Sequence, residues 1–405
     1  MSEMVGKLFG WVNSRLPVSN TFERHLSKHP VPSKVNFWYL FGALASVVLI
    51  IQIVSGIWLI MPYSNPEEEA FASIEYIMRD VDYGWVIRYM HTTGASMFFA
   101  VVYLHMFRGL LYGSYQKPKE LVWIFGCTIY LAMMAEGFLG YVLPYGQMSY
   151  WGAQVIISLF GAIPYIGESL ELWIRGDYYI SGITVSRFFA LHVVALPLVL
   201  IALVFLHLIA LHEVGAGNPE GVDIEEHLDD DGVPLDSVPF FPYKVLNALV
   251  GIGVFMTVFA IIMFFFPEGG GYFIEMANFE EANPLVTPEH IAPVWYYSPY
   301  YAMLRAVPDK LGGLIVMGSA VAILFVVPWL DKSKVASIRY KGIYSKVALA
   351  LFGISFITLG YLGTVSVTEV RKTMSVICTI IYFAFFLLMP IYTKYEKTLE
   401  VPKRL

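Results

Sequence analysis

Long apolar runs separated by short polar segments make up most of this chain of 405 residues. A helix needs about 20 apolar residues to cross a bilayer core of roughly 30 Å. Eight runs are long enough, so the pattern predicts an all-α integral membrane protein with eight transmembrane helices. Their predicted bounds are Phe37 to Met61, Trp85 to Leu111, Val122 to Leu143, Ile183 to Leu211, Val245 to Phe266, Leu314 to Leu330, Ile343 to Gly363 and Met374 to Tyr392.

The composition agrees with a membrane protein and argues against several other classes. Hydrophobic residues make up 57% of the chain and charged residues 14%, which is unlike a soluble globular protein. The net charge of −6, without a basic stripe, gives no reason to expect nucleic acid as a partner. The two cysteines, Cys127 and Cys378, lie inside predicted helices and form neither a covalent haem motif nor a disulfide framework.

Positive charge predicts the orientation, because Lys and Arg are retained on the cytoplasmic side. Most of the 26 Lys and Arg residues fall in segments on the same side as the N-terminus, so both termini are predicted to be cytoplasmic. Charges such as Arg24 and His25 indicate an amphipathic surface segment at the N-terminus and not a cleaved signal peptide. The predicted divisions are this segment, a four-helix bundle, an acidic cytoplasmic loop without Lys or Arg, and a second four-helix region: residues 1–36, 37–212, 213–242 and 243–405.

Four of the nine histidines lie deep inside predicted helices. His91 and His105 are in the second helix, and His192 and His207 are in the fourth, which crosses the membrane in the same direction. They therefore form two pairs at two depths, about 21 Å apart at a rise of ~1.5 Å per residue. Two facing imidazoles fill both axial positions of a haem iron, and such a haem transfers electrons because it has no open position.

The four histidines could also serve without a cofactor. A single intramembrane histidine is often a hydrogen-bonded core residue or part of a proton relay. Two matched pairs favour haem instead, so we predict that the first four helices hold two non-covalent haem b groups with these histidines as iron ligands. In the fourth helix the interval is fifteen residues, which rotates the second imidazole by about 100°. Pro197 lies between the two histidines and is expected to kink or locally unwind the helix.

Glycines and arginines extend the haem prediction. Glycines at the same fourteen-residue interval would let a flat macrocycle approach the first and third helices, although glycines are also common at ordinary helix crossings. Arginines close to the histidines would pair with haem propionates, although each taken alone could be an interfacial arginine. The glycines are Gly42, Gly56, Gly126 and Gly140, and the arginines are Arg88, Arg108 and Arg187.

Five segments carry a resemblance to a known family over essentially the whole chain. They resemble motifs of the cytochrome b subunit of the respiratory quinol:cytochrome c oxidoreductase, complex III, in its undivided bacterial form. In chain order they are "RYMHTTGASMFFAVVYLHMFRGLLYGSY", "GYVLPYGQMSYWGAQVI", "RFFALHVVALP", "LHEVG" and "NPLVTPEHIAPVWY".

The resemblance implies a Q cycle in the bacterial cytoplasmic membrane. Quinol, with ubiquinone as the quinone, would be oxidised near the outer face. One electron would go to a Rieske iron–sulfur protein and on to a cytochrome c-type subunit, and the other through both haems to quinone near the inner face. Protons would be released outside and taken up inside. The resemblance also implies a homodimeric complex surrounded by lipid, with the iron–sulfur protein docking over residues 145–180 and 283–308.

The resemblance also implies the quinone-binding residues. At the outer site Gly152 would leave space for the quinol head, and the other wall would come from the loop that follows the fifth helix. An aromatic belt with loop prolines is the competing interpretation of that loop. At the inner site His212 of "LHEVG" would face the quinone, against the alternative of an ordinary helix-end histidine. The outer-wall residues are Pro293, Trp295, Tyr296 and Tyr301.

The chain departs from the family at proton-handling positions. Many members have Glu where this chain has Val294, and valine cannot accept a proton. Glu136, inside the third helix, is the candidate substitute, against a purely structural hydrogen-bonding role. At the inner site Ala216 and Ala248 replace polar residues of the family, which leaves the acidic loop as an alternative proton source.

Two further classes of membrane protein compete with a complex III subunit. A transporter or channel could use buried His and Glu to carry protons, but it would bind no haem. A di-haem membrane anchor for a dehydrogenase would need the histidines but not the outer quinol motifs. Sensitivity to outer-site quinol inhibitors separates the anchor from the complex III subunit.

Overall fold

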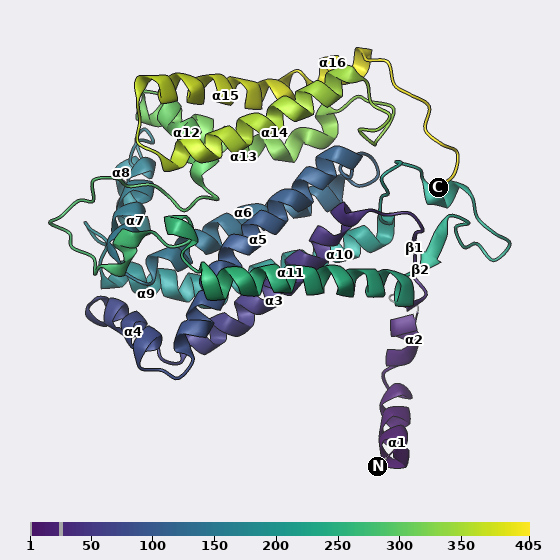
Figure 1. Ribbon diagram of the computed structural model, residues 1–405, viewed down its shortest axis with the longest axis horizontal. Helices are drawn as coiled ribbons and strands as arrows, with labels where there is room; N and C mark the ends of the chain where they lie inside the picture. Colours follow the sequence, from purple (N-terminus) through teal and green to yellow (C-terminus); the bar gives the residue numbers. More distant parts are fainter. Residues whose placement is uncertain (1, 24–26) are drawn as a thin grey trace.

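The computed structural model describes residues 2–23 and 27–405, so Arg24 and His25 of the N-terminal segment lie outside the described residues. Eight helical spans in this part of the chain are long and apolar enough to cross a membrane, which confirms the predicted number. Their axes are roughly aligned, and successive spans run back and forth across the molecule (Figure 1). In chain order they are η2 with α3 (Phe37–Leu40, Phe41–Ile60), α5 (Gly84–Tyr112), α6 (Glu120–Val142), α9 with η3 and α10 (Gly182–Ala190, Leu191–Ala195, Leu196–Val214), η5 with α11 (Phe240–Lys244, Val245–Phe265), α13 (Lys310–Leu330), α14 (Ile343–Thr364) and α15 (Glu369–Leu387).

Shorter elements lie at the ends of these spans. Strands β1 (Pro30–Pro32) and β2 (Ser237–Pro239) pair in an antiparallel fashion. Helix α1 (Ser2–Asn13) extends away from the rest of the molecule, as Figure 1 shows. The other short helices are α2 (Val18–Phe22), α4 (Glu67–Arg79), α7 (Gln147–Phe160), α8 (Gly167–Arg175), η4 (Ile224–Glu226), η6 (Gly269–Gly271), η7 (Met276–Phe279), α12 (Ser298–Ala306) and α16 (Met389–Tyr395).

Two predicted helix starts were too late. The sixth span begins at Lys310 because Asp309 accepts a hydrogen bond from Gly312 N at 2.6 Å and so caps the helix ahead of the apolar run. The eighth begins at Glu369 because the side chain of Thr368 accepts from Arg371 N. Polar capping residues therefore extend both helices beyond their hydrophobic stretch. The eighth predicted end at Tyr392 was also wrong, because α15 ends at Leu387 and a new helix, α16, follows with Pro390 in its first turn.

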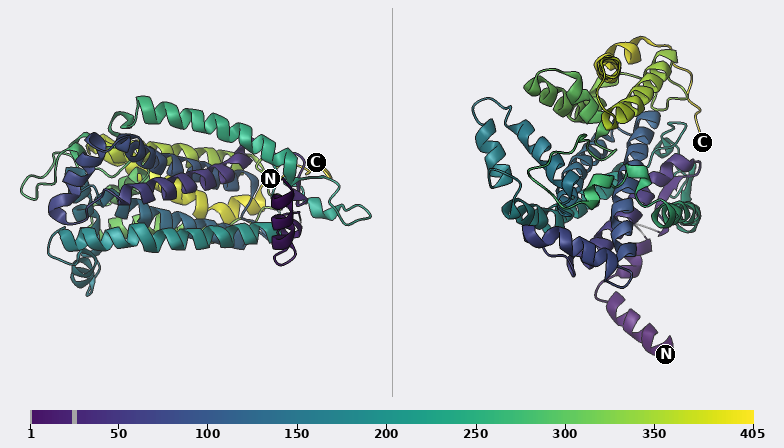
Figure 2. Two further views of the ribbon diagram at one scale, coloured as in Figure 1. Left: turned by 90° about the horizontal axis from the view of Figure 1, so that it is seen from below. Right: turned by 60° about the vertical axis from the view of Figure 1, so that its left-hand side comes forward.

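The first four spans associate in two pairs. Helix α3 packs along α5, and α6 packs along α10. The two inner faces of these pairs carry the four deep histidines. Helix α11 and the α9–α10 span lie along opposite sides of the molecule (Figure 2). Tyr130 of α6 and Tyr296 belong to an aromatic-rich buried core that joins α5 and α6 to helices α12 to α15.

Candidate functional site

The structure brings the deep histidines together in the two pairs expected from the sequence. His91 of α5 and His192 of η3 have ring centroids 6.2 Å apart, and the rings are nearly perpendicular. His105 of α5 and His207 of α10 have centroids 6.3 Å apart. A metal–imidazole bond is about 2.0 Å and the ring nitrogen lies about 1.1 Å from the ring centre, so two axial imidazoles of one ion have centroids about 6 Å apart. Both pairs therefore have the spacing that an axially saturated haem iron requires.

The pair of His91 and His192 is called the upper pair below, and the pair of His105 and His207 the lower pair. Hydrogen bonds at the upper pair leave Nε2 of each ring free for a metal. His192 Nδ1 donates to the carbonyl oxygen of Glu136 at 3.0 Å, because a carbonyl can only accept. Ser55 Oγ donates to Ile51 O at 2.6 Å, so the 2.9 Å contact between Ser55 Oγ and His91 Nδ1 uses the imidazole proton. Each Nε2 then keeps its lone pair, which is the form that binds iron.

The longer interval in the fourth span is absorbed by its backbone. Residues Leu191–Ala195 form a single π-helical turn, and Pro197 follows in the first turn of α10. A π-turn accommodates one residue more than an α-turn, so it returns His207 to the face that carries His192. The structure therefore contains the local unwinding that the sequence predicts near Pro197.

Each of the four predicted glycines lies against one histidine ring. A Cβ added at Gly42 would lie 3.0 Å from His105 Cε1, and one at Gly56 would lie 3.3 Å from His91 Cε1. On α6 a Cβ added at Gly126 would lie 3.4 Å from His207 Cε1, and one at Gly140 would overlap His192 Cε1. The absence of side chains at these positions is what gives the imidazoles their room.

Gly140→Ala is expected to displace His192 and to lower the content of the upper haem. The added Cβ would overlap the ring, and the ring cannot retreat without losing its hydrogen bond to Glu136. Haem quantitation and the optical spectrum of the purified complex measure the effect. Gly253→Ala is the matched control, since nothing lies within 4 Å of its added Cβ. An unchanged spectrum in the Gly140 variant would contradict the expectation.

A cavity of about 440 Å³ lies between the helices at the upper pair. His91, His192 and the predicted propionate partner Arg88 line it, and it continues to Val294 and Tyr296 of the outer motif. Glu136 also lines it, with Oε1 3.1 Å from His192 Nδ1. The predicted substitute acid is thus in contact with a candidate iron ligand.

The other two predicted arginines differ from Arg88. Arg108 lies beside Tyr39, with its guanidinium 4.8 Å from the ring centroid, and donates to Ser114 Oγ at 2.9 Å. Arg187 donates to the carbonyl of Trp173 at 2.8 Å and is absent from the described cavity lining. Their pairing with propionates stays a prediction.

The predicted outer-wall residues do not all line the same cavity. Pro293 and Trp295 line a second cavity of about 330 Å³, whereas Tyr296 lines the first and stacks on Phe99 at 3.9 Å. Tyr301 lines neither of these two cavities, and its hydroxyl donates to the Ile291 carbonyl at 3.3 Å. A Cβ at Gly152 would meet only Tyr141 Cε1, at 3.7 Å, so space remains beside it.

Two neighbours of the predicted sites were not predicted from the sequence. His212 stacks on His29, with ring centroids 3.9 Å apart, and no motif pointed to His29. Glu275 lines the second cavity with Pro293 and Trp295 and accepts a hydrogen bond from Tyr141. A lone acid in the aromatic stretch "GYFIEMANF" was the available signal for Glu275.

Comparison with known proteins agrees with this geometry. The family model "Cytochrome b/b6/petB" matches residues 26–215, and "Cytochrome b(C-terminal)/b6/petD" matches residues 281–383. A cytochrome b from Allochromatium vinosum is 54% identical over 97% of both chains. One from Rickettsia prowazekii is 46% identical over 97% of this chain and 96% of its own.

A solved structure resembles the whole fold. It is described as a hyperthermophilic respiratory complex III, and the similarity has a TM-score of 0.89 at 36% identity. It covers 95% of this chain and 98% of the other. The family models, the full-length relatives and the shared fold together show that this chain belongs to the cytochrome b family, as its motifs predicted.

Proposed function

We propose that the chain is the haem-carrying, quinol-oxidising redox subunit of a ubiquinol–cytochrome c reductase. The observation that carries this proposal is the pair of facing imidazoles at each of two depths, with centroid separations of 6.2 Å and 6.3 Å. Under this proposal the chain takes part in a Q cycle. Quinol is oxidised at an outer site, one electron leaves to a Rieske iron–sulfur partner, and the other crosses the membrane to quinone at an inner site.

The residues of the chain have distinct tasks in this proposal. His91, His192, His105 and His207 hold two haem b groups, which supply one-electron redox chemistry without an open iron position. Arg88, Arg108 and Arg187 are the candidate partners of the propionates. The apolar walls of the larger cavity keep bulk water away from the upper pair.

In this proposal one quinone site lies near the upper histidine pair and the other near the lower pair. We assign the outer quinol site to Gly152 and to Pro293, Trp295, Tyr296 and Tyr301, and the inner quinone site to His212. Glu136 contacts His192 and could relay a proton at the upper level. The iron–sulfur protein would dock over residues 145–180 and 283–308, and a cytochrome c-type subunit would receive its electron.

The remaining assignments follow from the family and the charge pattern. The segments 1–36, 37–212, 213–242 and 243–405 serve as surface segment, di-haem bundle, cytoplasmic loop and quinol-site region. Both termini face the cytoplasm of a bacterium, the complex is a homodimer, and ubiquinone is the quinone. Release of protons outside and uptake inside couple the reaction to proton translocation.

Haem quantitation combined with an optical redox titration of the purified complex tests the proposal. We expect two b-type haems per copy of this chain, with separable midpoint potentials, because the two histidine pairs lie in different surroundings. A complex without haem would overturn the proposal and favour a proton transporter. Haem without inhibitor-sensitive quinol oxidation would favour a di-haem anchor.

A further inference from the structure

The outer site needs a base that its own motif does not supply. Oxidation of quinol releases two protons, and a carboxylate near the quinol oxygens is a suitable acceptor. Position 294 of this chain, which follows Pro293 in the sequence, is a buried valine that lines the larger cavity. Valine has no lone pair, so the proton acceptor must lie elsewhere.

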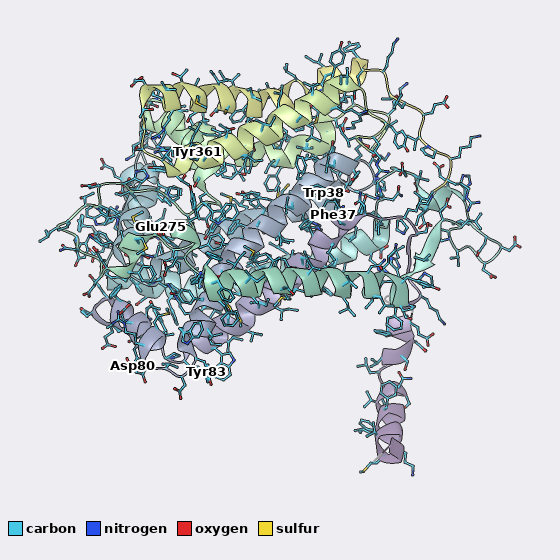
Figure 3. The ribbon with its side chains drawn as sticks, viewed as in Figure 1. Phe37, Trp38, Asp80, Tyr83, Glu275 and Tyr361 are labelled. Carbon is cyan, nitrogen blue, oxygen red and sulfur yellow. The ribbon has the colours of Figure 1, made fainter. Side chains whose placement is uncertain are left out.

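Glu275 lies close to the two sequence neighbours of Val294 in space, although it belongs to an earlier part of the loop. It follows η6 in the loop after α11, and it lines the second cavity together with Pro293 and Trp295. Figure 3 shows Glu275 near the end of the molecule where Asp80 and Tyr83 lie, away from Phe37 and Trp38. It lies between the two segments that the family models match, and no motif of the sequence pointed to it.

A hydrogen bond connects Glu275 to the larger cavity. The hydroxyl of Tyr141 donates to Glu275 Oε2 at 2.6 Å. Tyr141 belongs to α6 and lines the cavity that holds His91 and His192, so the pair spans the wall between the two cavities. The Tyr141 ring is also the nearest neighbour of the space beside Gly152.

The surroundings of Glu275 suit a proton acceptor better than a structural ion pair. Among the described residues, no Lys or Arg lines its cavity and none forms a salt bridge with it. Burial raises the pKa of Glu275 to about 7, and the hydrogen bond from Tyr141 opposes this rise. The titratable groups that face it are Tyr141, Tyr272, Tyr296 and His290.

We propose that Glu275 is a catalytic residue that accepts a quinol proton at the outer site, in place of the acid missing at position 294. The inference rests on the proposed function. Oxidation of the quinol to quinone would break both of its O–H bonds. One proton would form a carboxyl O–H on Glu275, and the other would leave with the electron that the iron–sulfur partner accepts. The second electron would go to the haem that His91 and His192 would hold. The proton on Glu275 then leaves to water through the cavity toward the exposed His290, and the carboxylate is restored.

Glu136 is less suited to this step. Its Oε1 contacts His192 Nδ1 at 3.1 Å, and it lies inside α6 on the side of the candidate iron ligand. Glu275 instead lies beside the motif residues that form the outer wall. Replacing Glu275 and replacing Glu136 should therefore have different effects on the pH dependence of quinol oxidation.

The test is the rate of quinol:cytochrome c reduction by the intact purified complex, measured from about pH 5.5 to about pH 9. Only the deprotonated carboxylate accepts a proton, so the wild-type rate should rise through about pH 7. Glu275→Gln should lower kcat by about 100-fold and abolish that rise, with both haems retained. Glu280→Gln, an exposed carboxylate in the same loop, should change neither.

Further variants keep the proposal testable if Glu275→Gln does not assemble. Glu275→Asp should restore part of the rate and the pH dependence. Tyr141→Phe removes a hydrogen bond that stabilises the carboxylate, so it should move the rise to higher pH. A normal profile in Glu275→Gln, or loss of the rise in Glu136→Gln alone, would overturn the proposal. Wild-type complex without haem or quinol oxidation would instead overturn the proposed function.

Discussion

His207→Ala is expected to leave one b-type haem per chain and to lower quinol:cytochrome c reduction by at least about 100-fold. The reason is that His105 alone cannot fill both axial positions of an iron at the lower level. The facing ring of His207 lies at 6.3 Å, and the other two deep histidines form the separate upper pair. Without a redox group at this level, the electron would have to cross the distance between the upper pair and the inner face in one step. Reoxidation of the upper level, and with it quinol oxidation, would therefore be slow.

Haem quantitation and a flash or stopped-flow trace of b-haem reduction measure this outcome. His227→Ala is the matched control, because that histidine is exposed on the acidic loop, outside the bundle. We expect the control to keep both haems and full activity. Two haems with unchanged potentials in His207→Ala would refute the assignment of the lower pair.

Asp331→Ala is expected to destabilise the protein by about 3 to 5 kcal/mol. Asp331 Oδ2 accepts from Lys341 Nζ at 2.5 Å, and the two side chains are 0% and 5% exposed. The same oxygen accepts from Tyr115 at 2.7 Å and from Gln116 at 3.0 Å, which ties the loop after α5 to the end of α13. Removing the carboxylate leaves a buried, uncompensated ammonium and two unsatisfied donors.

Thermal unfolding of the detergent-solubilised complex, followed by haem absorbance and intrinsic fluorescence, checks this expectation. Asp230→Ala, in the exposed acidic loop, removes the same charge without a buried partner and should have little effect. The double replacement Asp331→Leu with Lys341→Met should recover much of the lost stability, because no buried charge then remains unpaired. A melting temperature for Asp331→Ala equal to that of the control would contradict the argument.

Much of the helical framework could be predicted from the sequence because it depends on local patterns. Continuous apolar runs must be helical in a membrane, since each backbone group needs a partner within its own segment. The number of spans and the helices carrying His91 and His192 therefore followed directly. Helix ends did not, because the caps Asp309 and Thr368 lie outside the apolar runs.

The candidate site could also be predicted only in part from the sequence. Equal depth and helical periodicity are enough to pair the histidines, and the fourteen-residue glycine interval marks the surfaces that face them. The extra residue in the fourth span raised a question that only the backbone answers, through the π-turn at Leu191–Ala195. Pro197 indicated where the helix is irregular, but it did not determine the form of the irregularity.

What the sequence determined by itself is the one-dimensional order of this protein: eight apolar spans, two levels of histidines and the motifs of the cytochrome b family. The tertiary structure decided which polar side chains from distant segments share a space. The contact of Glu275 with Tyr141 and the buried pair of Asp331 and Lys341 belong to this second class. Hydrophobic burial is read from each segment alone, whereas a buried polar group is stable only beside partners that the packing of other segments supplies.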